Sequence, residues 1–77
     1  MEIRVQLYSI LREKLPAEAK GSAVRQLEDG ATLAELLADL GIERRVVVSV
    51  NDVQEPDLSR PLSDGDEVKI FASISGG

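Results

Sequence analysis

Residues 32–41 read TLAELLADLG, and this stretch predicts the principal helix of the fold. Thr32 and Glu35 have the spacing of a capping box, in which two side chains serve the first backbone N–H groups of a helix. The leucines that follow recur at i, i+3, i+4 and i+7, which places them on one helical face: Leu33, Leu36, Leu37 and Leu40. Gly41 stands where a left-handed residue commonly ends a helix. We therefore expect one helix that lays a leucine stripe against a second layer.

The segment at the N-terminus predicts a strand followed by a short helix. Residues 2–8 alternate between apolar and polar side chains, the pattern of a half-buried strand. Its apolar positions share one face: Ile3, Val5 and Leu7. Residues 9–15 then place apolar side chains at helical spacing behind Ser9 as a cap, and Pro16 limits this helix to a short turn. Residues 22–27 are a weaker strand candidate.

The second half of the chain predicts three more strands. Residues 46–50 are almost all valine, which indicates an interior strand with both faces covered or paired. Asn51-Asp52 forms a tight turn into a short edge strand at residues 53–55. The last strand spans residues 67–74, and its core face carries Val68, Ile70 and Ala72.

These elements predict a two-layer α+β domain that spans residues 1–77, with a mixed sheet of about five strands packed on one main helix. The length of 77 residues allows one small core and leaves little room for a closed internal active site. No stretch approaches ~20 apolar residues, and the first residues resemble a strand and not a signal peptide. A cytoplasmic protein is the default expectation.

The composition excludes several kinds of chemistry. The chain has no cysteine and no histidine, which excludes disulfides, thiolate metal sites and the usual general base. Fourteen acids and nine bases give a net charge of −5. The bases are scattered and form no stripe that would follow phosphates, so we expect no nucleic acid and no membrane partner. The acidic balance weakly favours a basic protein partner.

Two charged clusters have alternative interpretations. The acids at Asp64, Asp66 and Glu67 could hold a cation, although turn chemistry before a strand explains them better. Arg44 and Arg45 could contact the acids of a partner, but a solvated pair at the start of a strand is the simpler interpretation. The same choice, between a local charge pair and a docking role, applies to Arg12 and Glu13.

Five stretches together resemble one family: LYSILRE at residues 7–13, GATLAELLADLG, VVSVNDV, PLSDGDEVKIF and the terminal SGG. They are similar to the small subunit of molybdopterin synthase and, more widely, to ubiquitin-like sulfur carriers of the MoaD and ThiS type. The resemblance covers most of the chain and is weakest over residues 16–28. It implies a β-grasp fold in which the first and last strands lie adjacent and parallel in the middle of the sheet.

The resemblance also implies that Gly77 is the working residue. A separate E1-like adenylyltransferase, similar to MoeB or ThiF, would adenylate its carboxylate with ATP, and a sulfur donor protein would convert the adenylate to a thiocarboxylate. This chain would bind no cofactor, since it lacks a glycine-rich phosphate loop followed by lysine. Gly76 and Gly77 lack a Cβ, so the backbone can enter a narrow channel. The chain would then be a sulfur-donating subunit with no catalytic side chains of its own.

The remaining site residues are expected to meet that partner. Residues 73–77 would form a flexible tail, in which Ile74 and Ser75 are expected to bind the partner. Tyr8 and Phe71 have the parity opposite to the core residues of their strands. If those strands are neighbours, both aromatic rings lie on the solvent face and are candidate interface anchors.

The acceptor of the sulfur stays open at this point. The resemblance favours molybdopterin synthase, with a MoaE-like large subunit as partner. Ala72-Ser73 stands where many such small subunits have Pro-Pro, which keeps thiamine thiazole synthesis and tRNA thiolation as alternatives. The same activated Gly77 would also serve a ubiquitin-like protein modifier. A plain β-grasp binding module is the third class, and the lack of a basic stripe counts against RNA as its partner.

Overall fold

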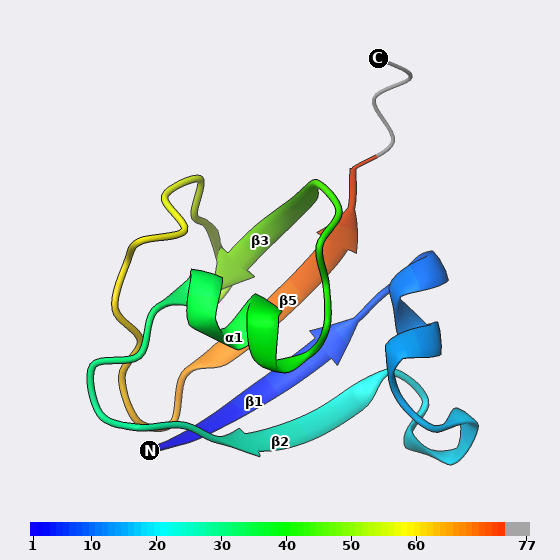
Figure 1. Ribbon diagram of the computed structural model, residues 1–77, viewed down its shortest axis with the longest axis horizontal. Helices are drawn as coiled ribbons and strands as arrows, with labels where there is room; N and C mark the ends of the chain where they lie inside the picture. Colours follow the sequence, from blue (N-terminus) through cyan, green and yellow to red (C-terminus); the bar gives the residue numbers. More distant parts are fainter. Residues whose placement is uncertain (74–77) are drawn as a thin grey trace.

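The computed structural model describes residues 1–73, and residues 74–77 lie outside the described part. Figure 1 shows one sheet with a single α-helix across one face and two short 3₁₀ helices near one end. In chain order the elements are β1 (Glu2–Leu7), η1 (Ser9–Lys14), η2 (Ala17–Ala19), β2 (Ser22–Gln26), α1 (Leu33–Asp39), β3 (Val46–Val50), β4 (Val53–Gln54) and β5 (Glu67–Ala72). The expected order is confirmed, with η2 as an addition.

The five strands form one mixed sheet with the order β2-β1-β5-β3-β4, so β5 is the middle strand. β1 and β5 run parallel, with Leu7 beside Ile70. The other three pairs are antiparallel. The expected central pairing of the first and last strands is therefore confirmed. Because β5 is hydrogen-bonded on both sides, two neighbours fix its position and direction.

The core lies between the sheet and α1. Alternate strand residues point toward the helix and are buried: Ile3, Val5, Leu7, Val48, Val50, Val68 and Ile70. The leucine stripe of α1 faces them and is buried along its whole length: Leu33, Leu36, Leu37 and Leu40. Fully burying one such side chain contributes about 1.5–3 kcal/mol, so these two faces account for most of the stabilising contacts. Within residues 1–73, no helix is long and apolar enough to cross a membrane.

Both ends of α1 are capped as the sequence predicts. At the start, Thr32 Oγ1 accepts a hydrogen bond from the backbone N–H of Glu35 at 3.2 Å. At the end, Gly41 has a φ of +74°, a conformation that costs glycine little. The N–H of Gly41 donates to the carbonyl of Ala38, and the N–H of Ile42 donates to that of Leu37. This pair of bonds is a Schellman motif, which turns the chain sharply toward β3.

The segment after β1 is helical, but the predicted Ser9 cap is wrong. Tyr8 is the residue before the first turn, and its side chain makes no capping bond. Ser9 instead has a φ of +53°, because the chain turns abruptly from the strand into η1. A 3₁₀ helix has three residues per turn, so its side chains do not align as in an α-helix. Leu11 and Leu15 reach the core, whereas Ile10 is 53% exposed.

The expectation that both faces of β3 are covered or paired is confirmed for its pairing on both sides, but only one face is covered. Val48 and Val50 are buried under α1, whereas Val47 is 40% exposed on the opposite face. The reason is that the structure places its helices on one side of the sheet, so valines of the other parity face solvent. β3 is nevertheless an interior strand, as predicted, since it lies between β5 and β4.

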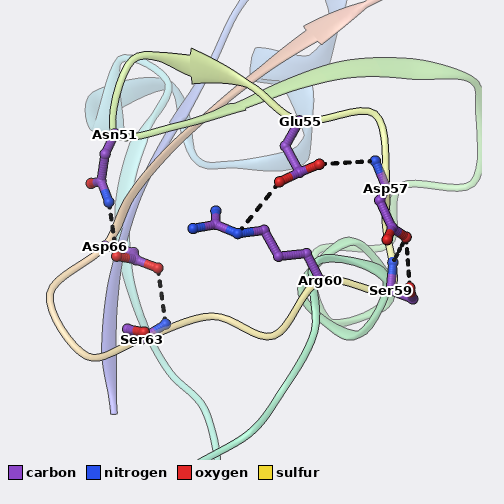
Figure 2. A network of polar contacts seen from close by, with 7 residues as sticks. All are labelled: Asn51, Glu55, Asp57, Ser59, Arg60, Ser63 and Asp66. Carbon is purple, nitrogen blue, oxygen red and sulfur yellow. Dashed lines mark hydrogen bonds and ion pairs between the residues drawn. The ribbon is translucent and has the colours of Figure 1, made fainter.

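Polar side chains order the loops between β3 and β5 (Figure 2). Asp66 accepts hydrogen bonds from Asn51 Nδ2 and from the backbone N–H of Ser63, both at 2.9 Å. These bonds join the β3–β4 turn to the turn before β5. Farther along, Arg60 Nε lies 3.4 Å from Glu55 Oε1, which closes the loop after β4. The start of β5 is therefore held by specific contacts.

Candidate partner-docking face

The two aromatic side chains lie together on the face of the sheet that α1 does not cover. Tyr8 directly follows β1 and Phe71 lies in β5, and their rings stack with centroids 4.4 Å apart and an interplanar angle of 8°. The register explains the contact, since Leu7 pairs with Ile70 and the next position of each strand faces outward. Aromatic pairs of this kind contribute ~0.5–1.5 kcal/mol beyond the area they bury. The predicted placement outside the core is confirmed, and the stack is new.

Val47 extends this aromatic pair into a small apolar surface. It is the cross-strand partner of Phe71 in the β3–β5 ladder. Phe71 is 38% exposed and Val47 is 40% exposed, so both offer apolar area to a partner. We call Tyr8, Val47 and Phe71 the docking face. The sequence carried a signal for Val47, because its parity is opposite to that of Val48 and Val50.

A charged pair borders the docking face. Lys69 lies two residues before Phe71 on the same side of β5, and its Nζ is 2.8 Å from Asp52 Oδ1. The hydrogen bond that Lys69 donates to Asp52, together with the negative charge of Asp52, raises the pKa of Lys69 above the usual 10.5. Lys69 therefore keeps its positive charge at neutral pH and marks one polar edge of an otherwise apolar surface.

The end of β5 leads from this face toward the C-terminus. The N–H of Ser73 donates a hydrogen bond to the carbonyl of Arg45 at 3.2 Å, so the start of β3 holds the last described residue. The other predicted site residues, Ile74, Ser75, Gly76 and Gly77, lie outside the described residues. Of the expected tail at residues 73–77, only Ser73 can be placed. The geometry thus brings Tyr8 into contact with Phe71, which lies in β5, the strand that precedes the tail.

The acidic turn before β5 is built by protein hydrogen bonds. Asp64 Oδ1 accepts the backbone N–H of Glu2 at 2.6 Å, and Asp66 holds Asn51 and Ser63 as described above. Turn chemistry therefore explains both aspartates. Within residues 1–73, no group of three acidic side chains is arranged to hold a metal ion.

The sheet order, the single covering helix and the parallel central strands define a β-grasp, ubiquitin-like protein. More particularly, the chain belongs to the ThiS family, whose model matches residues 5–77. The sulfur carrier protein ThiS of Thermus thermophilus is 40% identical over 55 residues, which are 64% of this chain and 83% of that protein. The predicted membership of the ThiS/MoaD-like, ubiquitin-like sulfur carriers is confirmed.

Solved structures agree with this fold at lower sequence identity. The solution structure of the Haloferax volcanii HVO 2177 protein has a TM-score of 0.79 at 23% identity and covers 100% of this chain and 87% of that one. Small archaeal modifier protein 1 of the same organism has a TM-score of 0.76 at 16% identity, over 95% and 98% of the two chains. A complex of subunits 1 and 2 of the molybdopterin-converting factor from Helicobacter pylori gives 0.66 at 23% identity, with full coverage of both chains.

Proposed function

We propose that this chain carries sulfur as a thiocarboxylate on Gly77. The observation that supports this most is the family match, which runs through residue 77 and so includes the Gly-Gly pair. The segment 74–77 also follows directly from β5, the middle strand of the sheet. A rigid body with a short glycine segment after its central strand suits a cargo group that must reach into another protein.

The chemistry needs two steps on a partner enzyme. A carboxylate is a poor electrophile, so an oxygen of Gly77 first attacks the α-phosphorus of ATP and pyrophosphate leaves. Sulfide released by a donor protein then attacks the carbonyl carbon of the adenylate, the bond from that carbon to the phosphate oxygen breaks, and AMP leaves the thiocarboxylate behind. Glycine at 76 and 77 places no side chain beside that carbon, so the approach of the nucleophile is unobstructed. The E1-like enzyme holds the ATP, and this chain supplies the acyl group.

The docking face gives the partner a surface to bind before the glycines enter its site. Tyr8, Val47 and Phe71 form an exposed apolar surface with aromatic rings, the composition typical of interface centres. It adjoins the end of β5, so a partner that covers it is placed next to Ser73, after which the glycines follow in the sequence. The same surface can serve the activating enzyme and the acceptor in turn.

Intact-mass analysis tests the carrier proposal. The chain is incubated with its E1-like enzyme, ATP and a sulfur donor, and a sulfur-for-oxygen mass gain at Gly77 is expected. A chain that lacks Gly77 and a reaction without ATP are the controls, and neither should gain mass. Absence of the gain with every cognate enzyme would contradict the proposal. Higher-mass conjugates in cells that require Gly77 would instead favour a protein modifier.

As acceptor we propose the large subunit of molybdopterin synthase. The resemblance of residues 7–13 and 61–71 to the small subunit supports it, and the Helicobacter pylori complex shares the fold of this chain. A thiazole-forming synthase is the second candidate, because the Thermus thermophilus relative is a ThiS. Retention of one of these two synthases by the immobilised chain, and not of the other, decides between them.

A further inference from the structure

Seven of the fourteen acids of this chain lie at the end of the sheet where β1 and β5 begin. The turns at residues 28–30, 51–52 and 63–67 all lie there and contain no lysine or arginine. Polar contacts join these turns to one another and to the start of β1: the Met1 amino group pairs with Asp29, the Glu2 N–H donates to Asp64, and the Asn51 side chain donates to Asp66. Seven acids lie in this region: Glu2, Glu28, Asp29, Asp52, Asp64, Asp66 and Glu67. These turns thus form an acidic region at the end of the sheet opposite the end of β5.

The opposite end, where β5 leads into the tail, is basic. η1 contributes Arg12 and Lys14, and the residues before β3 contribute Arg44 and Arg45, against two acids in the same segments. All four cationic side chains are exposed. In the described part of the chain none of them forms an ion pair within 4.0 Å, although Arg25, Arg60 and Lys69 do.

Two of these cations flank an exposed apolar side chain. A shallow hollow of about 410 Å³ is lined by Ile10, Leu11, Glu13, Lys14 and Arg44. Ile10 is 53% exposed, although Leu11 next to it is almost fully buried. One wall of the hollow comes from η1, which follows β1, and the other from the residue that leads toward β3. In the sheet, β5 lies between β1 and β3 (Figure 1). The N–H of Ser73 donates to the carbonyl of Arg45, the neighbour of Arg44, so the hollow adjoins the end of β5.

We propose that this hollow docks an acidic segment of the activating enzyme, with an apolar side chain over Ile10 and carboxylates against Lys14 and Arg44. The inference rests on the proposed function, because it takes the activating enzyme as the partner. Charge complementarity identifies the occupant: an apolar floor whose rim carries two unpaired cations against one acid, Glu13, fits an apolar residue beside acids. Any enzyme that acts on Gly77 must approach this end of the molecule.

The proposed partner segment is acidic, whereas the net charge of the whole chain alone favours a basic partner. The six residues of β5 span about 17–20 Å between the acidic end and the basic end. This is about twice the Debye length of ~8 Å at physiological salt. A partner at the tail end is therefore attracted by the local cations, while the distant acids are screened. Affinity should fall as salt rises, although the chain as a whole is acidic.

Calorimetric titration of the purified E1-like enzyme tests the charged rim. Lys14→Gln combined with Arg44→Gln should weaken binding by roughly fivefold to tenfold and flatten the dependence of affinity on salt. Arg4→Gln is the matched control, because Arg4 is exposed and unpaired in the described structure but lies in β1 away from the hollow. Equal affinities for the control and the double variant would overturn the proposal, as would affinity that rises with salt.

A second pair of variants tests the apolar floor. Ile10→Ser should weaken binding severalfold without lowering the melting temperature, since Ile10 is already half exposed. Val24→Ser removes a side chain of similar exposure from β2 and should leave binding unchanged. If these variants behave as stated and Gly77 is never adenylated, the hollow is confirmed and the carrier function fails. If Gly77 is adenylated and all variants bind alike, the hollow is wrong and the carrier function stands.

Discussion

At the scale of single residues, Ile70 and Phe71 are neighbours in β5 with different surroundings. Ile70 is fully buried under α1, whereas Phe71 is 38% exposed and stacks on Tyr8. Alternation along the strand thus assigns one residue to the core and the next to the docking face. Because the two residues are neighbours with different surroundings, one substitution at each can test partner binding and stability separately.

Phe71→Ala is expected to reduce partner affinity by at least tenfold while it costs only about 1–2 kcal/mol of unfolding free energy. The loss of affinity follows from removal of the central aromatic ring, and the small stability cost from its partial exposure. Ile70→Ala is the contrast and should cost about 2–5 kcal/mol, because it leaves a cavity in the core. Urea denaturation and titration with the activating enzyme measure the two quantities. Unchanged affinity for Phe71→Ala would show that the docking face is misplaced.

Asp57 offers a test by titration. The Ser59 hydroxyl and then the Ser59 backbone N–H hold the pKa of Asp57 below its ordinary value of 3.8 (Figure 2). Ser59→Ala should raise that pKa part of the way back, because the N–H bond remains. A depressed carboxyl pKa stabilises the fold above the unfolded-state pKa, and this contribution is lost as the pH falls through the folded value. The variant should therefore lose less stability on acidification.

Carbon-13 NMR titration of the Asp57 carboxyl group measures the shift. Ser63→Ala is the control, because Ser63 contacts Asp66 through its backbone N–H and does not touch Asp57. An Asp57 pKa that is the same in the wild type and in Ser59→Ala would mean that the hydroxyl contact does not persist in solution.

At the scale of elements, the cap of α1 determines how the chain enters β3. Gly41→Ala places a Cβ on a residue with a φ of +74°, where nothing lies within 4 Å of the added atom. The cost is therefore backbone strain alone, about 1–2 kcal/mol. For a domain of this size that lowers the melting temperature by roughly 4–16 °C. Gly41→Asn should lower the melting temperature less than Gly41→Ala does, because asparagine tolerates this conformation. A calorimetric melting temperature lower for Gly41→Asn than for Gly41→Ala would contradict the assignment of Gly41 as a left-handed helix cap.

Local patterns predicted most elements because alternation and the leucine stripe each follow from one buried face. Ser9 and Val47 show where such reasoning failed. The Ser9 cap failed because the join between β1 and η1 required a left-handed residue, which apolar spacing does not encode. Val47 was missed because the valines before and after it obscure its parity, which is opposite to that of Val48 and Val50. The Tyr8–Phe71 stack depended on a register that only the paired strands define.

At the scale of the whole molecule, the position of each strand predicts its protection from hydrogen exchange. β5 is bonded on both sides and carries the fully buried Val68 and Ile70. Its core amides should exchange only through global unfolding. β2 is an edge strand, and its register turns the N–H groups of Ser22, Val24 and Gln26 away from β1. These amides should exchange within minutes in NMR experiments, and protection equal to that of β5 would indicate that the edge is covered in solution.

The parallel pairing of β1 with β5 also determines how the molecule responds to force. The chain enters β1 at one end of the sheet and leaves β5 at the other, so tension between the two acts along both strands. The hydrogen bonds of the pair are then sheared together and cannot open one after another. An enzyme that unfolds the chain by pulling on the glycines must break the hydrogen bonds of the β1–β5 and β3–β5 ladders at the same time. The folded domain should therefore stay intact under a pulling force at its C-terminus while partners bind and dissociate.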